Sequence, residues 1–281
     1  MNKPVHNKKG ESDKASVESN KAKIAKRVVE VLEYFDDDHP LATVMDIVRR
    51  YNRPQSSTSE LLSSLVGLGL LYKDPYSRSY TPTPRAALLG CSVQSGIVRN
   101  GRLPGLIDRL SAQTGLGVAV LGMVGLSVQI FSWRGGKYPL RTSQTDGFCG
   151  GQQECLTDSA GGVLLLSTVS PPRRDGMLRR LNAEATEDRK YVLSEMTSRV
   201  QQCLDSGFAH GVAGFGSIAD ISAMLLPDQP TGQPLAIALV YEPSEHIDPA
   251  ALRQTLADAI ARCAADTPNQ DDNVALLVGV A

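Results

Sequence analysis

The spacing of hydrophobic positions predicts three short helices and a hairpin near the start of the chain. Apolar residues recur at helical spacing over 21–36, at Ile24, Val28, Val31, Leu32 and Phe35. A second helix fits 43–51, and a third runs from near Pro54 to the Gly-Leu-Gly of 67–69. Two strand-like runs then flank the Pro-Tyr-Ser-Arg turn at 75–78. This order is typical of a winged helix-turn-helix.

The remainder of the chain predicts a second domain of mixed type. Strand-like runs at 116–125, 126–135 and 138–142 precede several helical runs, and two further strands precede a final helix over 248–263. Strands grouped at both ends with helices between them predict an α+β domain with one sheet. The predicted organisation is a disordered polar tail (1–20), a winged helix-turn-helix (21–84), a linker helix (85–100), the second domain (101–265) and a C-terminal tail (266–281).

The third helix has two contrasting faces when its residues are placed about 100° apart. Leu61, Leu65 and Leu68 share one face, flanked by Thr58 and Leu62, and we expect this face to be buried. The opposite face is a ridge of short polar side chains at Ser56, Ser59 and Ser63, with Gln55 and Glu60 beside it. Short side chains allow close approach to a major groove, where serine, Gln55 and Glu60 can all bond base edges.

Two interpretations of Glu60 stay open at this point. Ser57-Thr58-Ser59-Glu60 matches a capping box, in which Ser57 caps the helix and Glu60 bonds back to the cap amide. Alternatively Pro54 takes the first helical position and Glu60 points outward. The second register is favoured because it gives the helix its full length.

The net charge of −1 conceals an asymmetry along the chain. Residues 1–85 hold 14 basic and 11 acidic side chains, whereas the remainder holds 15 and 19. Affinity for DNA is largely neutralisation of phosphates, and the third helix supplies no basic residue. The candidate phosphate contacts therefore flank it, at Arg49, Arg50 and Arg53, with Lys21 and Lys23 before them and Lys73 and Arg78 in the wing.

The stretch from Pro54 to Gly90 resembles the helix-turn-helix and wing of isocitrate-lyase-regulator-type (IclR-type) transcription factors. The pattern Pro-x-Ser-[ST], Leu-Leu, Gly-[LY]-[LV], Asp-Pro, Tyr and Leu-Gly is matched by Pro54, Ser56, Ser57, Leu61, Leu62, Leu65, Gly69, Leu70, Asp74, Pro75, Tyr80, Leu89 and Gly90. Segments 156–167, 206–209 and 235–243 agree more weakly. The resemblance implies a DNA-binding regulator with a GAF-like effector domain, acting as a dimer or tetramer on roughly palindromic operators.

The same resemblance implies an effector site in the second domain. The matching positions are Thr157, Ala160, Gly161, Gly211, Ala219, Ile221 and Leu239. Several are polar in relatives that bind small carboxylates but are apolar or glycine here, which favours an aromatic or partly apolar effector. Phe131 and Trp133 would supply a stacking wall, and Arg134 and Arg141 an anion contact. A basic residue stands at the position of Glu60 in many relatives, so base preference should differ.

Several other classes are disfavoured. No apolar run approaches the length of a membrane helix, and the N-terminus lacks the apolar centre of a secretory signal. The five cysteines form no metal-binding pattern, so we expect no cofactor and a cytoplasmic location. A thiol enzyme or redox sensor using Cys149, Cys155 and His210 lacks a base-orienting group. A DNA-binding scaffold whose second domain only oligomerises stays an alternative. The effector, the operator and the sign of regulation, repressor or activator, are left open.

Overall fold

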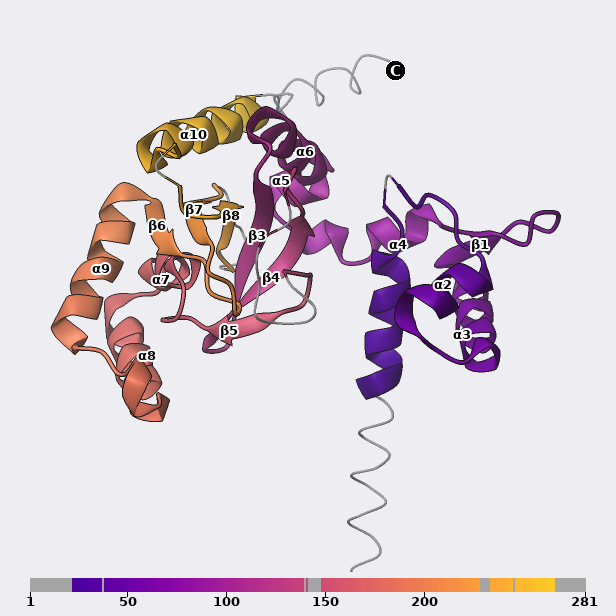
Figure 1. Cartoon of the computed structure of the whole chain (residues 1–281), viewed down its shortest axis with the longest axis horizontal. Helices are drawn as coiled ribbons and strands as arrows, with labels where there is room; N and C mark the ends of the chain where they lie inside the picture. The colour runs from indigo at the N-terminus through magenta and orange to yellow at the C-terminus, as the bar shows by residue number, and fades with distance from the viewer. Residues whose placement is uncertain are drawn as a thin grey trace, which may run out of the picture. The chain divides into compact units, whose positions relative to one another are not determined.

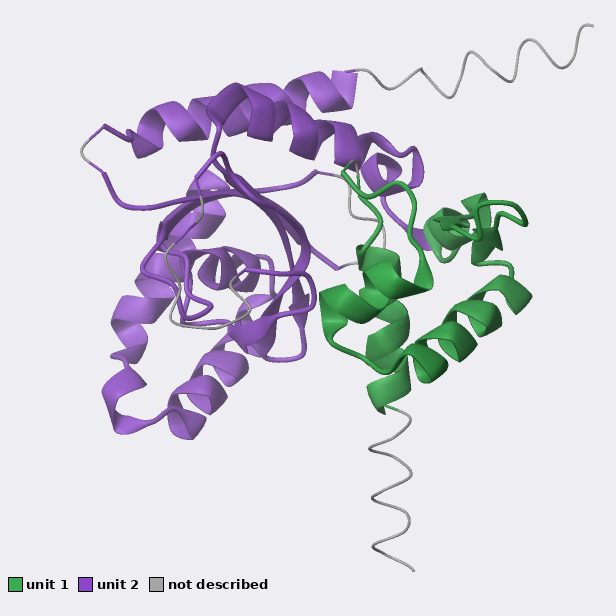
Figure 2. Cartoon of the chain, turned by 45° about the vertical axis from the view of Figure 1, so that its right-hand side comes forward, with its two compact units in different colours: residues 1–92 green, residues 93–281 purple. Residues whose placement is uncertain are grey.

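The computed structural model describes residues 22–36, 38–138, 140, 148–227, 233–244 and 246–265. The chain divides into two compact units, Met1–Ser92 and Val93–Ala281 (Figure 2), and each is described by itself. The predicted tails, 1–20 and 266–281, lie outside the described residues. Within the described part of the chain, no helix has the length and apolar character needed to cross a membrane.

Unit 1 is a winged helix-turn-helix, as the sequence predicts (Figure 1). Its helices are the N-terminal helix (residues 22–33), α2 (Val44–Tyr51) and α3 (Gln55–Gly67), and its wing is the antiparallel pair β1 (Leu71–Lys73) and β2 (Tyr80–Pro82). Ala42 forms an isolated antiparallel bridge with Tyr80, on the edge of β2 that does not face β1.

The N-terminal helix ends three residues before its predicted end at 36. The Asp36 carboxylate accepts hydrogen bonds from the backbone N–H groups of Asp38 and His39, at 3.0 and 2.7 Å. Such a local side-chain bond offers the backbone an alternative to further helix.

One hydrophobic core holds unit 1 together. It joins the N-terminal helix, α2, α3 and the wing through Val31, Ala42, Ile47, Leu62, Leu65, Leu71 and Tyr80, none more than 2% exposed. Each helix contributes one apolar stripe, so no helix could bury its stripe without the others.

The segment 85–100 is not the single linker helix that the sequence predicts. It is divided into α4 (Pro84–Leu88), a 3-10 turn (Cys91–Val93) and α5 (Gly96–Arg99). Gly90 has a φ of +75°, a left-handed conformation that ends the helical path between the first two pieces.

Unit 2 is built on a six-stranded antiparallel sheet with strand order β5-β4-β3-β8-β7-β6. Its strands are β3 (Gly117–Val124), β4 (Ser127–Arg134), β5 (Gln153–Cys155), β6 (Phe208–Val212), β7 (Asp220–Leu225) and β8 (Leu235–Tyr241). The predicted α+β class is confirmed. The sequence missed β5 and β6, because a three-residue polar strand and a five-residue strand containing glycine lack the alternation that marks a strand.

Helices cover both faces of this sheet. One hydrophobic cluster lies between the sheet and α6 (Arg102–Thr114) with α10 (Pro249–Ala265). The other lies against α7 (Ala160–Ser167), α8 (Pro171–Glu184) and α9 (Leu193–Ser206). The sheet curls on the side of α7 (Figure 2).

The central helix of unit 2 is α7, in which all eight residues are buried. A helix that is apolar all round must be enclosed by protein. A Cβ on Gly162 would overlap the Leu156 carbonyl oxygen, so only glycine lets the helix approach this segment so closely.

The core of unit 1 generates a test of helix packing. Leu62 is fully buried, whereas Leu68 at the end of the same helix is 61% exposed. We expect Leu62→Ala to lower the free energy of unfolding of unit 1 by about 2–5 kcal/mol, because it leaves a cavity. Leu68→Ala is the matched control and should change it by less than about 0.5 kcal/mol.

Urea unfolding followed by circular dichroism measures both variants. The only tryptophan, Trp133, lies in unit 2, so its fluorescence reports whether that unit is unaffected. Equal losses for the two leucine variants would contradict the packing described for α3.

Candidate functional site

The helix-turn-helix of unit 1 is defined by local signals at both helix ends. Thr43 caps α2 in a capping box with Asp46, whose side chain accepts from the Thr43 backbone N–H at 2.8 Å. These bonds from Thr43 hold the pKa of the Asp46 carboxyl below its usual value. Asn52 adopts a left-handed conformation at the end of α2, and α3 begins three residues later at Gln55. A turn of this length is typical of the motif.

The buried stripe of α3 differs from the predicted one. Thr58, Leu62 and Leu65 are its buried residues, and Leu61 is only partly buried. Leu68 was expected in the buried face but follows the last helical residue and is exposed. The stripe is therefore centred nearer Leu62 than Leu61.

The opposite face of α3 is the polar ridge that the sequence predicts. Gln55, Ser56, Glu60 and Ser63 are exposed, whereas Ser57 and Ser59 are partly buried. Apart from Glu60, only short or uncharged polar side chains occupy this ridge.

The structure decides between the two registers of α3. Pro54 is the N-cap, and no side chain caps the helix, so the capping box of Ser57 and Glu60 does not form. The favoured register is correct to within one residue, since Pro54 directly precedes the first helical position. Glu60 projects outward and has no capping role.

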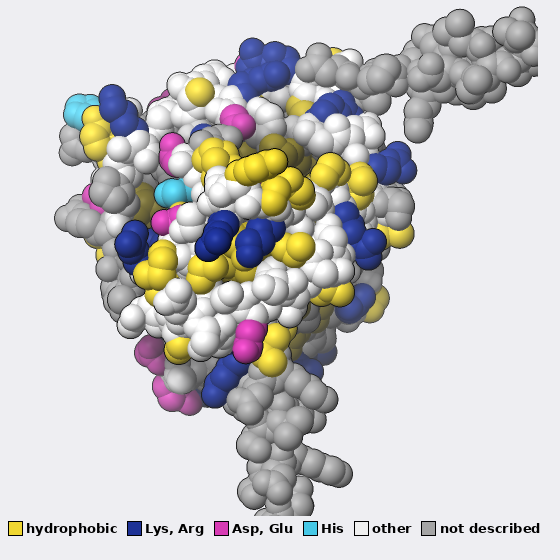
Figure 3. Space-filling model, turned by 90° about the vertical axis from the view of Figure 1, so that its right-hand side faces the viewer, with side chains coloured by type: hydrophobic (Ala, Val, Ile, Leu, Met, Phe, Trp, Pro, Cys, Tyr) yellow, Lys and Arg dark blue, Asp and Glu magenta, His cyan; other side chains and the backbone are white. Residues whose placement is uncertain are grey.

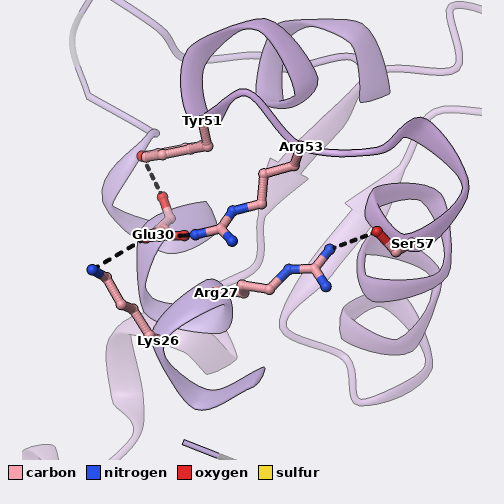
Figure 4. A network of polar contacts seen from close by, with 6 residues as sticks. All are labelled: Lys26, Arg27, Glu30, Tyr51, Arg53 and Ser57. Atoms are coloured by element: carbon pink, nitrogen blue, oxygen red, sulfur yellow. Dashed lines mark hydrogen bonds and ion pairs between the residues drawn. The ribbon is translucent and has the colours of Figure 1, made fainter. Parts of the chain in front are cut away.

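A polar network joins the N-terminal helix to α2 and α3 (Figure 4). Arg53 Nη2 lies 2.6 Å from Glu30 Oε2, and Lys26 Nζ lies 3.9 Å from Glu30 Oε1. The Tyr51 hydroxyl donates to the Glu30 carbonyl oxygen at 2.6 Å, and Arg27 Nη2 donates to Ser57 Oγ at 3.1 Å. The guanidinium of Arg53, an expected phosphate contact, is thus held by a carboxylate of its own unit, and its contact with DNA stays a prediction.

The other predicted phosphate contacts lie on the surface of unit 1. Arg49, Arg50, Lys73 and Arg78 are all exposed, while Lys21 lies outside the described residues and Lys23 is exposed. On the face shown in Figure 3, Lys and Arg side chains lie among exposed hydrophobic side chains. Unit 1 therefore offers positive charge on α2 and on the wing, but none on α3.

The wing ends in a turn held by Asp74. Its carboxylate accepts from the backbone N–H groups of Tyr76 and Ser77, at 2.7 and 3.0 Å, and these bonds lower the pKa of Asp74. Arg78 has a φ of +58°, and the Tyr76 side chain is 96% exposed. Tyr76 was missed from the sequence, because only the turn geometry places it at the tip.

In unit 2 the two predicted stacking residues lie on opposite faces of the sheet. The Trp133 ring covers Gly117 and lies 4.9 Å from the Phe148 ring, on the side of α7. The Phe131 ring covers Gly122, whose missing side chain would point to the other face. A β-bulge between Val120 and Leu121 changes the pairing register, so Phe131 and Trp133 cannot form one wall.

Most of the other predicted effector-binding positions gather at the start of α7. A Cβ on Gly161 would lie 3.6 Å from Ile221 Cδ1, and one on Gly211 would lie 3.6 Å from the Ala160 Cβ. Ala219 is buried in the same cluster, whereas Leu239 belongs to the cluster on the opposite face and was placed wrongly. Thr157 Oγ1 lies 3.1 Å from Cys155 Sγ, and Arg141 lies outside the described residues.

The carboxylate of Glu154, which the sequence did not single out as a candidate, joins the two edges of the sheet. Glu154 lies on β5, and its Oε2 accepts from the backbone N–H of Phe215, in the turn after β6, at 2.5 Å. A Cβ on Gly214 would overlap Glu154 Oε1, a buried oxygen that has no hydrogen-bond partner among the described residues. Burial is the main cause that raises the pKa of Glu154 to about 7.

Comparison with known families identifies the helix-turn-helix. A family model described as the IclR helix-turn-helix domain matches residues 25–75. Residues 25–75 therefore form an IclR-type helix-turn-helix domain. The matched segment contains α2, α3, β1 and all six residues of the network in Figure 4.

Solved IclR structures share the fold along most of the chain. An IclR transcriptional regulator from Alicyclobacillus acidocaldarius is 18% identical, with 87% of this chain and 97% of that chain covered and a TM-score of 0.52. An IclR homolog from Microbacterium hydrocarbonoxydans, complexed with 4-hydroxybenzoate, is 15% identical, with 87% and 100% covered and a TM-score of 0.51. Identities this low show the fold alone. No curated protein gave a significant match.

Glu154 gives the stability of unit 2 a testable pH dependence. Its folded-state pKa of about 7 lies above the ordinary value of 4.5, so the folded protein keeps a proton that the unfolded chain releases. Stability from this group is present below about pH 4.5 and is lost as the pH rises through 7. We expect Glu154→Gln, which never ionises, to be more stable than the wild type above pH 7 by about 1–2 kcal/mol, allowing for solvent screening.

Urea titrations followed by Trp133 fluorescence, at several pH values from about 4.5 to above 7, measure the difference in free energy of unfolding between Glu154→Gln and the wild type. It should vanish at the acid end, where both side chains are neutral. A difference that is independent of pH would mean that Glu154 is not the titrating group.

Proposed function

We propose that this protein is an IclR-type transcriptional regulator and that it reads the major groove of DNA with the polar ridge of α3. The observation that carries the proposal is the rotation of α3, which buries Thr58, Leu62 and Leu65 and exposes Gln55, Ser56, Glu60 and Ser63. Short hydroxyl side chains permit close approach, and Gln55 and Glu60 offer hydrogen bonds to adenine and to cytosine N4.

Phosphate contacts would come from both sides of α3. Arg49 and Arg50 are exposed at the end of α2, and Lys73 and Arg78 are exposed in the wing. We propose a homodimer, or a pair of dimers, on a roughly palindromic operator, since two-fold symmetry in a regulator mirrors that of its site.

We further propose that a small aromatic or partly apolar metabolite binds unit 2 near the start of α7 and alters DNA binding. Support comes from the small residues Ala160, Gly161 and Gly211 close to one another and from the aromatic series Trp133, Phe148 and Phe215. The relative complexed with 4-hydroxybenzoate makes that aromatic acid a suitable first ligand to test.

The catalytic alternative gains nothing from the contacts of its candidate residues. Cys155 bonds Thr157, while His210 Nδ1 lies 3.2 Å from the Tyr241 hydroxyl. Among the described residues, no group of His, Cys, Asp and Glu could hold a metal ion. A scaffold whose second unit only oligomerises is the alternative that experiment must separate.

Substitution of Glu60 tests DNA reading. Because Glu60 projects outward and caps nothing, Glu60→Ala should change base preference at one position of each half-site without lowering the melting temperature. Its affinity for random DNA should rise, because a negative charge near phosphates is removed. Selection of bound duplexes from a random pool measures the preference.

Glu184→Gln serves as the control, since Glu184 is an exposed carboxylate of unit 2 that pairs with Arg180. It should leave the selected sequence unchanged. An unchanged preference in Glu60→Ala would remove Glu60 from the reading surface, and failure of the wild type to enrich any duplex would defeat the proposed function.

A ligand screen tests the effector proposal. Because Trp133 is the only tryptophan and lies beside Phe148, an aromatic ligand near α7 should change its emission and raise the melting temperature. The same compound should alter the affinity for a selected duplex. If a broad metabolite panel beginning with 4-hydroxybenzoate changes neither quantity, the scaffold alternative holds.

A further inference from the structure

Arg27 has a different electrostatic environment from its neighbour Arg53. The Arg53 guanidinium bonds both oxygens of Glu30, at 2.6 and 3.0 Å. Arg27 bonds the hydroxyl of Ser57. The Nε atoms of both arginines are buried and have no hydrogen-bond partner among the described residues, so the two differ in the carboxylate and not at Nε. Among the described residues, no carboxylate lies within ion-pair distance of Arg27, so its charge is not neutralised inside unit 1.

Neither of two carboxylates on the N-terminal helix, Glu30 and Glu33, forms an ion pair with Arg27 among the described residues. Glu30 serves Arg53 and Lys26, and Glu33 lies close enough to Glu30 that repulsion adds to desolvation in raising the pKa of Glu33. A partly buried guanidinium without a counter-ion is costly unless an anion completes its hydrogen bonds.

The position of Arg27 relates this charge to the DNA-reading helix. Ser57 is the third residue of α3, and its neighbour Ser56 belongs to the exposed ridge (Figure 4). Lys23 lies one turn before Arg27 on the same face of the N-terminal helix and is exposed. The N-terminal helix therefore carries positive charge beside the end of α3 that begins the ridge.

The adjoining cavity is too small to hold the anion. It has room for about one water molecule and is lined by Arg27, Glu30, Tyr51, Arg53 and Thr58 together with apolar side chains. A phosphate group would have to lie at the solvent edge of the guanidinium, where a DNA backbone can reach it.

We propose that Arg27 binds a phosphate of the DNA backbone while it holds Ser57, so that the N-terminal helix contacts DNA beside α3 and the wing. The proposal rests on the DNA-binding function proposed above. It assigns to Arg27 the role that the sequence assigned to Arg53, because Glu30 pairs with Arg53 and not with Arg27. Guanidinium groups bond phosphate oxygens in a planar geometry, and the terminal nitrogens of Arg27, not its buried Nε, are the donors that a phosphate would reach.

The salt dependence of DNA binding tests this assignment. Removal of one phosphate contact makes the slope of log affinity against log salt shallower by about 1. Arg27→Gln keeps a donor toward Ser57 but removes the charge, so its slope should fall by about 1 and its affinity at low salt by roughly tenfold. Fluorescence anisotropy on a short duplex of random sequence measures both quantities in the full-length protein.

Three further variants separate phosphate contact from a structural role. Ser57→Ala removes the link to α3 but keeps the charge, and Arg27→Lys keeps the charge in another shape, so both should retain the wild-type slope. Arg180→Gln, on an exposed arginine paired with Glu184 in unit 2, controls for the loss of net charge. Melting curves establish that each variant is folded. If Arg27→Gln unfolds, the salt slope of Arg27→Lys still tests the proposal, and Arg180→Gln shows how much of any change follows from net charge.

The outcomes are distinct. If Arg27→Gln has the wild-type slope, or if Ser57→Ala reproduces its loss of slope, Arg27 acts only on the orientation of α3 and the inference is wrong. A shallower slope in Arg27→Lys would also overturn it. If the wild type binds no duplex, the proposed function itself fails.

Discussion

Burial of Thr58, Leu62 and Leu65 sets the rotation of α3, and each candidate contact with a DNA base depends on that rotation. These side chains pack against Val31 of the N-terminal helix and Ile47 of α2 in one core. A helix cannot turn about its axis without exposing such a stripe, which would cost about 1.5–3 kcal/mol for each large side chain. The ridge of short polar residues is therefore held toward solvent by the residues behind it.

The same packing divides the basic residues of unit 1 into two groups. Arg53 faces inward at the turn between α2 and α3, where Glu30 holds it, and its charge is largely used within the unit. Arg49, Arg50, Lys73 and Arg78 remain exposed around α3, and Arg27 is partly buried without a carboxylate. A regulator whose reading helix carries no positive charge can place phosphate contacts on neighbouring elements, because phosphate contacts fix position and base contacts determine sequence.

In unit 2 the enclosed helix α7 constrains the packing around it, as the buried stripe of α3 does in unit 1. Glycines let it approach Leu121 and the Leu156 backbone closely, and the sheet curls on its side. The bond from the Phe215 N–H to Glu154 links β5, at one edge of the sheet, to the turn after β6, at the other edge. The predicted effector positions at the start of α7 therefore lie near a junction that depends on one partly buried carboxylate, whose pKa of about 7 makes it sensitive to pH.

The helices of unit 1, the wing and the α+β class of unit 2 could be predicted from the sequence, because periodicity, turn residues and helix breakers act between near neighbours. The polar ridge of α3 could be predicted as well, since it follows from helical geometry alone. Tertiary structure decided the exposure of Leu68, the opposite faces of Phe131 and Trp133, the pairing of Arg53 with Glu30 and the contact of Glu154 with Phe215. These features depend on where a helix ends, on where a bulge shifts the register of a strand, and on which distant segment supplies the partner of a charged side chain. The pattern of a single segment contains no information about such a partner.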